Sequence, residues 1–347
     1  MRVRALIGAT LVAWAALPAL ALAASADEGP PLRPVDAGPL LRPPLTVLRA
    51  VDRAPTAPAT SAKAPKKELI VLVGGYGSGP DDRTFDAFSA RVADEGGYDV
   101  VRFGQGLGTY DTFGAVDANA ERLRDSIRSV STGYDGVHIV THSMGGVVAD
   151  RAFALGLSVS DGVTTYVAWA SPHDGARAAQ ALQTTLTVSG PARDDTRAFT
   201  TSYFRDPDTA AVRDLARARA PAPPLGVARL DLRLATDVLV SSADARDPGV
   251  DSRVLLPASA AELEGHGGIL QSEEAFDLTL ATIRSRAVPP DERGLALRAV
   301  SSVVAQTVDR QAQTVLAVVC GVCLIGGIGA LVRRTLRPTI PWPPLSE

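Results

Sequence analysis

Six short apolar runs alternate with amphipathic stretches over the middle of this 347-residue chain. Between two of these runs, residues 117–130 place apolar side chains at the spacing of one helix face. Further helices are predicted to begin at Gly145 and to cover 272–284. Strands that alternate with helices predict an α/β domain with a mostly parallel sheet, covered on both faces. The predicted strands are 68–73, 98–103, 137–140, 164–169, 230–234 and 254–256.

The first 26 residues contain the three parts of a secretory signal peptide. Arg2 and Arg4 precede an apolar run over 5–23, and Ala-x-Ala cleavage sites lie at 21–23 and 24–26. We expect residues 1–26 to be removed on export. An uncleaved anchor is the alternative, because a run of this length is also long enough to span a bilayer.

A second apolar segment lies near the other end of the chain. Residues 315–332 contain no charge and are followed by Arg333, Arg334 and Arg337. This pattern is typical of a transmembrane helix whose C-terminal flank is cytoplasmic, with a buried core helix as the alternative. Both ends predict a single-pass protein of the cell membrane, with residues 27–314 outside and a cytoplasmic tail over 333–347.

The remaining chain divides into a spacer and one globular domain. Nine prolines within 27–65 indicate a linker over 27–66. The domain is predicted over 67–290, followed by a juxtamembrane segment over 291–314. An insertion of about 176–228, between two strands, is expected to form a cap over the carboxyl edge of the sheet, where open α/β sheets bind ligands.

Composition narrows the possible partners. A formal net charge of −3 gives no reason to expect nucleic acid. Both cysteines lie inside 315–332, where packing is favoured over redox or metal chemistry, so the outward domain must fold without disulfides. Small residues four positions apart predict a weak homodimer through the membrane helix. The pairs are Ala317/Gly321, Cys323/Gly327 and Gly326/Ala330.

The strand at 137–140 leads into the most informative motif of the chain, Thr-His-Ser-Met-Gly-Gly at 141–146. A strand that ends in a serine between small residues, just before a helix, is typical of a nucleophile elbow, which raises the Ser143 hydroxyl above the sheet. The turn needs small side chains two residues before and after the serine. Gly145 meets this need, whereas Thr141 replaces the usual glycine. An ordinary strand-to-helix connection remains the alternative.

A serine becomes a nucleophile when a histidine takes its proton and a carboxylate orients that histidine. His138 and His142 lie on the elbow strand, whereas His266 lies in a glycine-flanked loop after the last strand. The chain order serine, acid, histidine makes His266 the candidate base. Asp237, just after the strand at 230–234, is the favoured acid. Its competitors are Asp244, Asp247 and Asp251.

Two backbone N–H groups must hold the oxyanion, and one of them comes from the residue after the nucleophile, Met144. The second is expected from the Gly-rich loop after the first strand, where Tyr76 is the best candidate. This loop is not predicted to cradle phosphate, because no Gly-Lys-Ser/Thr follows and the acids in Pro-Asp-Asp at 80–82 would repel it. We expect neither a cofactor nor a metal ion.

Together these motifs resemble the α/β-hydrolases of the lipase and esterase type, over residues 68–286. The segment 141–146 resembles the family's Gly-His-Ser-Met-Gly-Gly, and Ala-Ser-Pro-His-Asp-Gly-Ala at 170–176 resembles its Thr-Pro-His-x-Gly-Thr segment. The acid loop at 237–240 and the histidine loop at 265–267 are also similar to the family's. The resemblance implies a structural role for His173. The chain departs from the family at Thr141 and at Gly74, where the oxyanion motif usually has histidine.

We therefore expect an α/β-hydrolase fold with a cap insertion and a C-terminal transmembrane helix. The expected activity is that of an outward-facing, membrane-anchored serine hydrolase that cleaves carboxylic esters of lipids or acylated envelope components. Two alternatives stay open. One is a catalytically inactive fold that serves as a binding module. The other is an acyltransferase or thioesterase that uses the same three residues.

Overall fold

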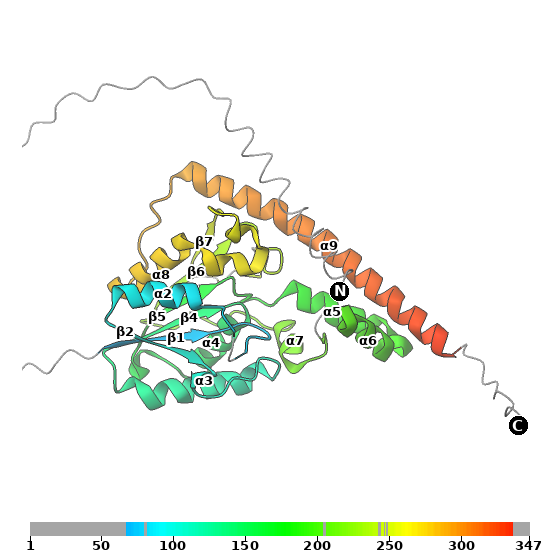
Figure 1. Ribbon diagram of the computed structural model, residues 1–347, viewed down its shortest axis with the longest axis horizontal. Coiled ribbons are helices and arrows are strands. Elements are labelled where there is room, and N and C mark those ends of the chain that lie inside the picture. The colour runs from blue at the N-terminus through cyan, green and yellow to red at the C-terminus, as the bar shows by residue number, and fades with distance from the viewer. Residues whose placement is uncertain are drawn as a thin grey trace, which may run out of the picture.

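The computed structural model describes residues 67–79, 82–203, 206–241, 244–245, 247 and 249–335 (Figure 1). The predicted signal segment at 1–26, the linker at 27–66 and nearly all of the predicted cytoplasmic tail lie outside these residues.

A seven-stranded sheet forms the centre of the domain, with strand order β3-β2-β1-β4-β5-β6-β7 and parallel pairing throughout. The order reverses between β1 and β4, so the carboxyl ends of these two central strands meet at one edge. This architecture confirms the predicted fold class. The strands are β1 (Glu68–Val73), β2 (Tyr98–Phe103), β3 (Gly106–Leu107), β4 (Val137–His142), β5 (Val163–Trp169), β6 (Ala228–Leu234) and β7 (Asp251–Leu255).

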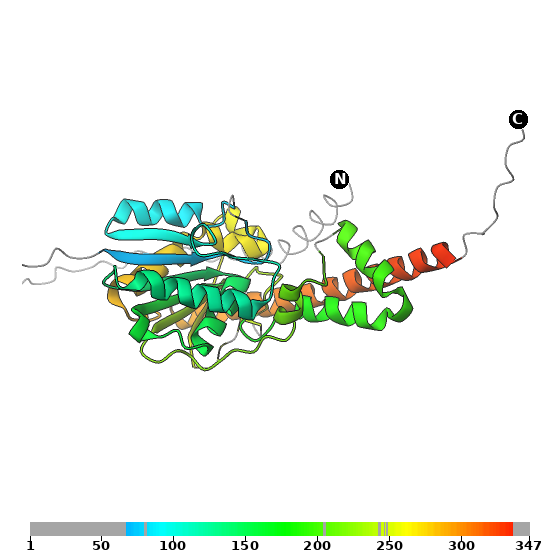
Figure 2. The same cartoon turned by 90° about the horizontal axis from the view of Figure 1, so that it is seen from below.

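Helices cover both faces of the sheet (Figures 1 and 2). Leu69, Val71 and Val73 of β1 point into one core, under α3 (Val116–Ser131) and α4 (Met144–Ala154). The alternate residues Ile70 and Leu72 point into a second core, under α2 (Asp86–Glu95) and α8 (Glu273–Ser285). Because both faces are buried, the central strands are continuous apolar runs. Three short 3₁₀ helices lie outside the insertion: η1 (Val159–Asp161), η3 (Ala261–Leu263) and η4 (Gly265–Gln271).

The segment between β5 and β6 contains most of the helices that stand apart from the sheet. They are α5 (Arg177–Val188), the 3₁₀ helix η2 (Gly190–Ala192), α6 (Arg193–Tyr203) and α7 (Ala210–Leu215). Helix α7 packs on α3, close to the domain, whereas α5 and α6 extend away from the sheet (Figure 1).

The C-terminal helix α9 (Leu295–Thr335) has 41 residues and begins well before the predicted span at 315. Its first half packs on the domain through the buried residues Ser301, Ala305 and Val308. Its second half is long and apolar enough to cross a membrane, with a mean hydropathy of 2.7 and only 11% of that stretch buried in the molecule.

One face of the second half of α9 packs against α6. Gly326 lies so close to Phe199 that an added methyl group would be 2.6 Å from the ring, and Gly327 lies equally tightly against Thr196. At the end of the helix Arg334 pairs with Asp195 at 3.5 Å. Part of the small-residue stripe expected to support a homodimer is therefore used within the chain, and the homodimer stays a prediction.

Candidate active site

Ser143 lies between β4 and α4 in a strained backbone conformation, with φ 56° and ψ −128°. A non-glycine residue adopts a positive φ only where its surroundings impose it, at a cost of about 1–3 kcal/mol. Here the Ser143 N–H donates to the Trp169 carbonyl at 2.9 Å, and the Ser143 carbonyl accepts from Gly146 at 3.0 Å. These bonds hold the sharp turn of a nucleophile elbow at the carboxyl edge of the sheet.

Three glycines give the turn its room. A methyl group on Gly145 would overlap the Val73 carbonyl oxygen, and one on Gly146 would overlap the Ser171 hydroxyl. A methyl group on Gly75 would lie 2.8 Å from the Ser143 Cβ. The loop after β1 therefore runs directly beside the elbow, which brings the predicted oxyanion loop next to the predicted nucleophile.

The substitution Gly145→Ala is expected to destabilise the domain by about 3 kcal/mol, because the clash is with backbone that no side-chain rotation relieves. Urea unfolding of the purified protein measures this loss. Gly79→Ala is the matched control, since a methyl group there meets nothing within 4 Å. Equal stability of the two variants would contradict the packing described for the elbow.

Thr141, the departure from the usual glycine, is fully buried on β4. Its register partners are Val73 on β1 and Ala168 on β5, and the small alanine leaves space on one side. Among the residues that the structure describes, nothing hydrogen-bonds to the Thr141 hydroxyl. The elbow thus forms around a threonine, at the cost of one buried polar group without a partner.

We expect Thr141→Val to stabilise the fold by about 1 kcal/mol, because valine keeps the shape and removes a buried hydroxyl that lacks a partner. The change should leave ester turnover unaltered. Urea unfolding checks the first expectation, and a lower stability would indicate that the hydroxyl has a partner in solution.

His266 and Asp237, predicted as base and acid, are hydrogen-bonded to each other. The His266 Nδ1 lies 2.9 Å from Asp237 Oδ2, and Asp237 Oδ1 accepts from the N–H groups of Leu239 at 2.9 Å and Val240 at 3.0 Å. Burial alone would raise the pKa of Asp237, but His266 and these donors bring its pKa below the usual value. The carboxylate is therefore ionised and fixed in orientation.

His142 places this pair beside the elbow. Its ring stacks on the His266 ring with 4.8 Å between centroids, and its Nε2 lies 3.3 Å from the His266 carbonyl oxygen. Burial, followed by the nearby His266, lowers the pKa of His142 to about 3, so this ring is neutral and donates from Nε2. His142 therefore supports the histidine loop rather than acting as a base.

The Ser143 side chain is half-buried, and within the described part of the chain it makes no hydrogen bond, including to His266. The structure brings acid and base into contact, while the Ser143 hydroxyl, one residue after His142, is unengaged. Hydrogen bonds between nucleophile and base are often long before a substrate binds.

The two oxyanion candidates flank Ser143. Met144 is the first residue of α4, so its N–H points out of a helix N-terminus, where the helix dipole favours negative charge. Tyr76 follows Gly75 in the loop after β1. Its hydroxyl donates to the Asp206 carbonyl at 3.1 Å, and its ring packs edge-on against Phe113 at 5.1 Å. The hydroxyl contact ties the oxyanion loop to the segment between α6 and α7, and the ring contact ties it to the loop before α3.

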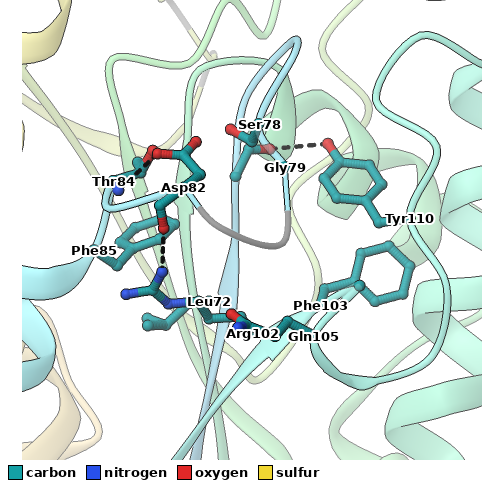
Figure 3. Close-up of a pocket in the computed structure, with 12 residues that line it drawn as sticks. Leu72, Ser78, Gly79, Asp82, Thr84, Phe85, Arg102, Phe103, Gln105 and Tyr110 are labelled. Atoms are coloured by element: carbon teal, nitrogen blue, oxygen red, sulfur yellow. Dashed lines mark hydrogen bonds between the residues drawn. The ribbon is translucent and has the colours of Figure 1, made fainter.

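Other residues hold the same loop from outside (Figure 3). The Tyr110 hydroxyl donates to the Gly74 carbonyl at 2.8 Å, and Arg102 donates to the Asp82 carbonyl. The Asp82 carboxylate accepts from the Thr84 N–H at 2.8 Å. They surround a cavity of about 50 Å³ that does not include Ser143. No pattern in the sequence indicated Tyr110 or Arg102, because their partners lie far along the chain.

Each competing acid is engaged elsewhere. Asp244 pairs with Arg177 at 3.3 Å and accepts from the Ser241 N–H. Asp247 contacts Arg229 at 2.6 Å, and Asp251 pairs with Arg253 at 3.1 Å.

The remaining histidines have structural surroundings. His138 lies between Thr165 at 2.8 Å and Glu68 at 3.0 Å. His173 is buried under α4, where its Nδ1 lies 2.5 Å from Asp150. Burial would lower the pKa of His173, but the nearby carboxylates, led by Asp150, bring it above its usual value. The contact between His173 and Asp150 links α4 to the end of β5.

The same cluster holds the group best placed to bind a metal. The ligand atoms of Asp150, His173 and Asp247 lie within 4.8 Å of one another. Arg229 contacts Asp150 at 3.1 Å as well as Asp247, so a metal ion there would compete with a fixed positive charge. The residues present fit an internal ion network better than a metal site.

One family of known proteins matches part of the chain. The family described as "PGAP1-like alpha/beta domain" matches residues 113–189, which include Ser143 and His173 but neither Asp237 nor His266. No curated protein matches the whole sequence significantly.

Several solved structures are similar in fold. A lipase from Bacillus licheniformis is 13% identical, with 67% of this chain and 96% of the lipase covered and a TM-score of 0.45. A thermophilic esterase from Thermogutta terrifontis is 18% identical over 64% of this chain and 91% of its own, with a TM-score of 0.42. A thioesterase from the prodiginine pathway of Streptomyces coelicolor is 21% identical over 66% and 96%, with a TM-score of 0.39.

The strand order and the elbow give the domain the architecture of an α/β-hydrolase fold, and a long apolar helix follows it.

Proposed function

We propose that this protein is a serine hydrolase that cleaves carboxylic esters through Ser143, His266 and Asp237. The observation that carries the proposal is the Asp237–His266 hydrogen bond near a strained serine elbow, where His142, the residue before Ser143, contacts the His266 ring. A metal or cofactor plays no part in the proposed reaction.

In the proposed mechanism, the Ser143 Oγ attacks the ester carbonyl carbon while His266 Nε2 takes the hydroxyl proton. Asp237 accepts from His266 Nδ1 and stabilises the imidazolium that forms. The carbonyl oxygen becomes an oxyanion, which accepts from the N–H groups of Tyr76 and Met144. The tetrahedral intermediate collapses, the C–O bond breaks, and the alcohol leaves with the proton from His266.

An acyl-enzyme on Ser143 remains after this step. Water attacks its carbonyl carbon as His266 takes a proton from the water, and a second tetrahedral intermediate releases the carboxylic acid and restores Ser143. An alcohol or thiol in place of water would give acyl transfer, so these groups do not by themselves select hydrolysis.

We further propose that the domain works outside the cell, anchored in the cell membrane through α9, on esters of lipids or acylated envelope components. The exposed apolar surface of α9 and the basic residues Arg333 and Arg334 at its end support this placement. Insertion of α9 into a bilayer requires α6 to leave the helix face that it covers in this structure, where Asp195 pairs with Arg334.

Labelling with a fluorophosphonate tests the nucleophile. The reagent transfers its phosphonyl group to an activated serine with loss of fluoride, so the wild-type chain should be labelled at Ser143 and Ser143→Ala should not. Ser78→Ala, in the neighbouring loop, is the control and should keep the label. A folded wild-type protein that takes no label would favour a binding module on an inactive fold.

A further inference from the structure

A partly buried tyrosine from the segment after β3 contacts the Gly-rich oxyanion loop that follows β1. The Tyr110 hydroxyl donates to the Gly74 carbonyl oxygen at 2.8 Å (Figure 3). The next residue in the loop, Gly75, touches the candidate nucleophile, because a methyl group added to it would lie 2.8 Å from the Ser143 Cβ and 3.3 Å from the Ser143 Oγ. The hydrogen bond from Tyr110 therefore ends one residue away from the backbone that lies against the nucleophile.

Two hydrogen bonds fix two successive peptide groups of this loop. Tyr110 holds the carbonyl of the peptide between Gly74 and Gly75. The Ser78 N–H donates to the carbonyl of the following peptide, that of Gly75, at 3.1 Å. A trans peptide is planar, with its C=O and N–H pointing in opposite directions. The bond to the Gly75 carbonyl thus directs the Tyr76 N–H, the candidate oxyanion donor, as long as the peptide before it is also held.

The loop has no side chain of its own that could hold the first of these peptides. Gly74 and Gly75 carry none, and glycine backbone is free to adopt several conformations. A side chain at position 74 is excluded, because its Cβ would lie 2.7 Å from the Ser78 Oγ. The Gly74 carbonyl oxygen also lies so close to the elbow that a methyl group on Gly145 would be 2.7 Å from it. The partner that fixes this carbonyl is therefore the distant Tyr110.

Tyr110 is itself fixed on several sides. Its ring packs on Phe103 with 4.9 Å between centroids, and a methyl group on Gly104 would lie 2.7 Å from its Cβ. The fully buried Asn119 of α3 accepts from the Asp111 N–H at 3.1 Å and donates to the Asp111 carbonyl at 2.7 Å. Burial raises the pKa of the Tyr110 hydroxyl, so this group stays protonated and remains a donor at neutral pH.

We propose that Tyr110 is a positioning residue of the oxyanion hole, whose hydroxyl fixes the loop after β1 so that the Tyr76 N–H faces the charge that develops on an ester carbonyl at Ser143. The inference rests on the proposed ester hydrolysis. Oxyanion donors stabilise the transition state because they are oriented before the charge forms. Without the Tyr110 bond, the glycine backbone has to reorient during the reaction, which removes part of that stabilisation.

Tyr110→Phe in the full chain tests the proposal. Loss of an entire oxyanion donor lowers kcat by about 10²- to 10³-fold. Here the donor stays but is less well aligned, so kcat for p-nitrophenyl butyrate should fall at least tenfold, while KM changes less than twofold. Tyr134→Phe is the matched control. Tyr134 packs against the same core, and its hydroxyl donates to Asp99 at 3.3 Å near the start of β2, at the opposite edge of the sheet, so kcat should not change.

A transition-state analogue distinguishes positioning from packing. With butyl trifluoromethyl ketone, the Ser143 Oγ forms a bond to the carbonyl carbon, the serine proton passes to His266, and the carbonyl oxygen becomes an oxyanion in the same hole. The inhibition constant of the ketone should rise by the factor by which kcat/KM falls in Tyr110→Phe. An unchanged inhibition constant, or a kcat within twofold of wild type, would overturn the inference.

Two precautions separate the possible failures. Rates are expressed per Ser143 labelled to completion with fluorophosphonate, so unfolded protein does not lower the measured kcat. If Ser143→Ala hydrolyses the ester as fast as wild type, the proposed function fails, and the role of Tyr110 fails with it. If Ser143→Ala is inactive and Tyr110→Phe is unimpaired, only the role of Tyr110 is wrong.

Discussion

Replacing Ser143 with alanine is expected to lower kcat for p-nitrophenyl butyrate by about 10⁶-fold, the loss typical of a serine triad without its nucleophile. The remaining turnover would come from the oxyanion donors and from substrate binding. The purified full chain is the material, and initial rates over a range of ester concentrations are the measurement.

The same variant should fold normally. Within the described residues the Ser143 hydroxyl makes no hydrogen bond, so its removal breaks none. The strained backbone is imposed by the Trp169 and Gly146 bonds, which alanine keeps. We therefore expect an unchanged midpoint in urea. A folded Ser143→Ala protein that turns over ester as fast as wild type would remove Ser143 from the mechanism.

The fold was predictable because its central strands are buried on both faces. β1 is apolar from Leu69 to Val73, since its side chains alternate between two cores. Elements with little burial escaped prediction. In α2 only Phe88 and Val92 are buried, and β3 has two residues, too few for any pattern.

The length of α9 also escaped prediction. Its first half mixes charges with apolar residues, and only three side chains there, at helical spacing, are buried against the domain. A pattern this sparse does not stand out from a polar juxtamembrane segment. The uncharged stretch that follows was visible, because an apolar helix of that length is rare outside membranes.

The candidate site was predictable only where a short stretch of sequence, or the order of residues along the chain, indicates a catalytic role. The elbow and the order of Ser143, Asp237 and His266 along the chain are local signals. The choice among acids depends in part on partners from distant elements, since Arg177 and Arg229 engage Asp244 and Asp247. The turn has space for Thr141 because its register partner in the next strand is the small Ala168, and no local pattern reveals that pairing.

Asp237→Asn is expected to lower kcat by about 10⁴-fold, the loss seen when a triad aspartate becomes an amide. The reason lies in the bonds around the carboxylate. Its Oδ1 already accepts from Leu239 and Val240, so the amide oxygen of asparagine takes that place. The amide NH₂ then faces His266 Nδ1, which must become the acceptor.

This reversal moves the imidazole proton of His266 to Nε2, where it blocks acceptance of the Ser143 proton. Asp244→Asn is the matched control: the Asp244 carboxylate pairs with Arg177 rather than with His266, so turnover of this variant should fall less than tenfold.

Because the pKa of Asp237 lies below its usual value, the carboxylate stays charged as the pH falls through about 4, the ordinary pKa of an aspartate. Loss of wild-type activity at a higher pH than that therefore reports protonation of a group other than Asp237. If Asp237→Asn keeps full turnover while Asp244→Asn loses it, Asp237 is not the triad acid, and Asp244 orients His266 instead.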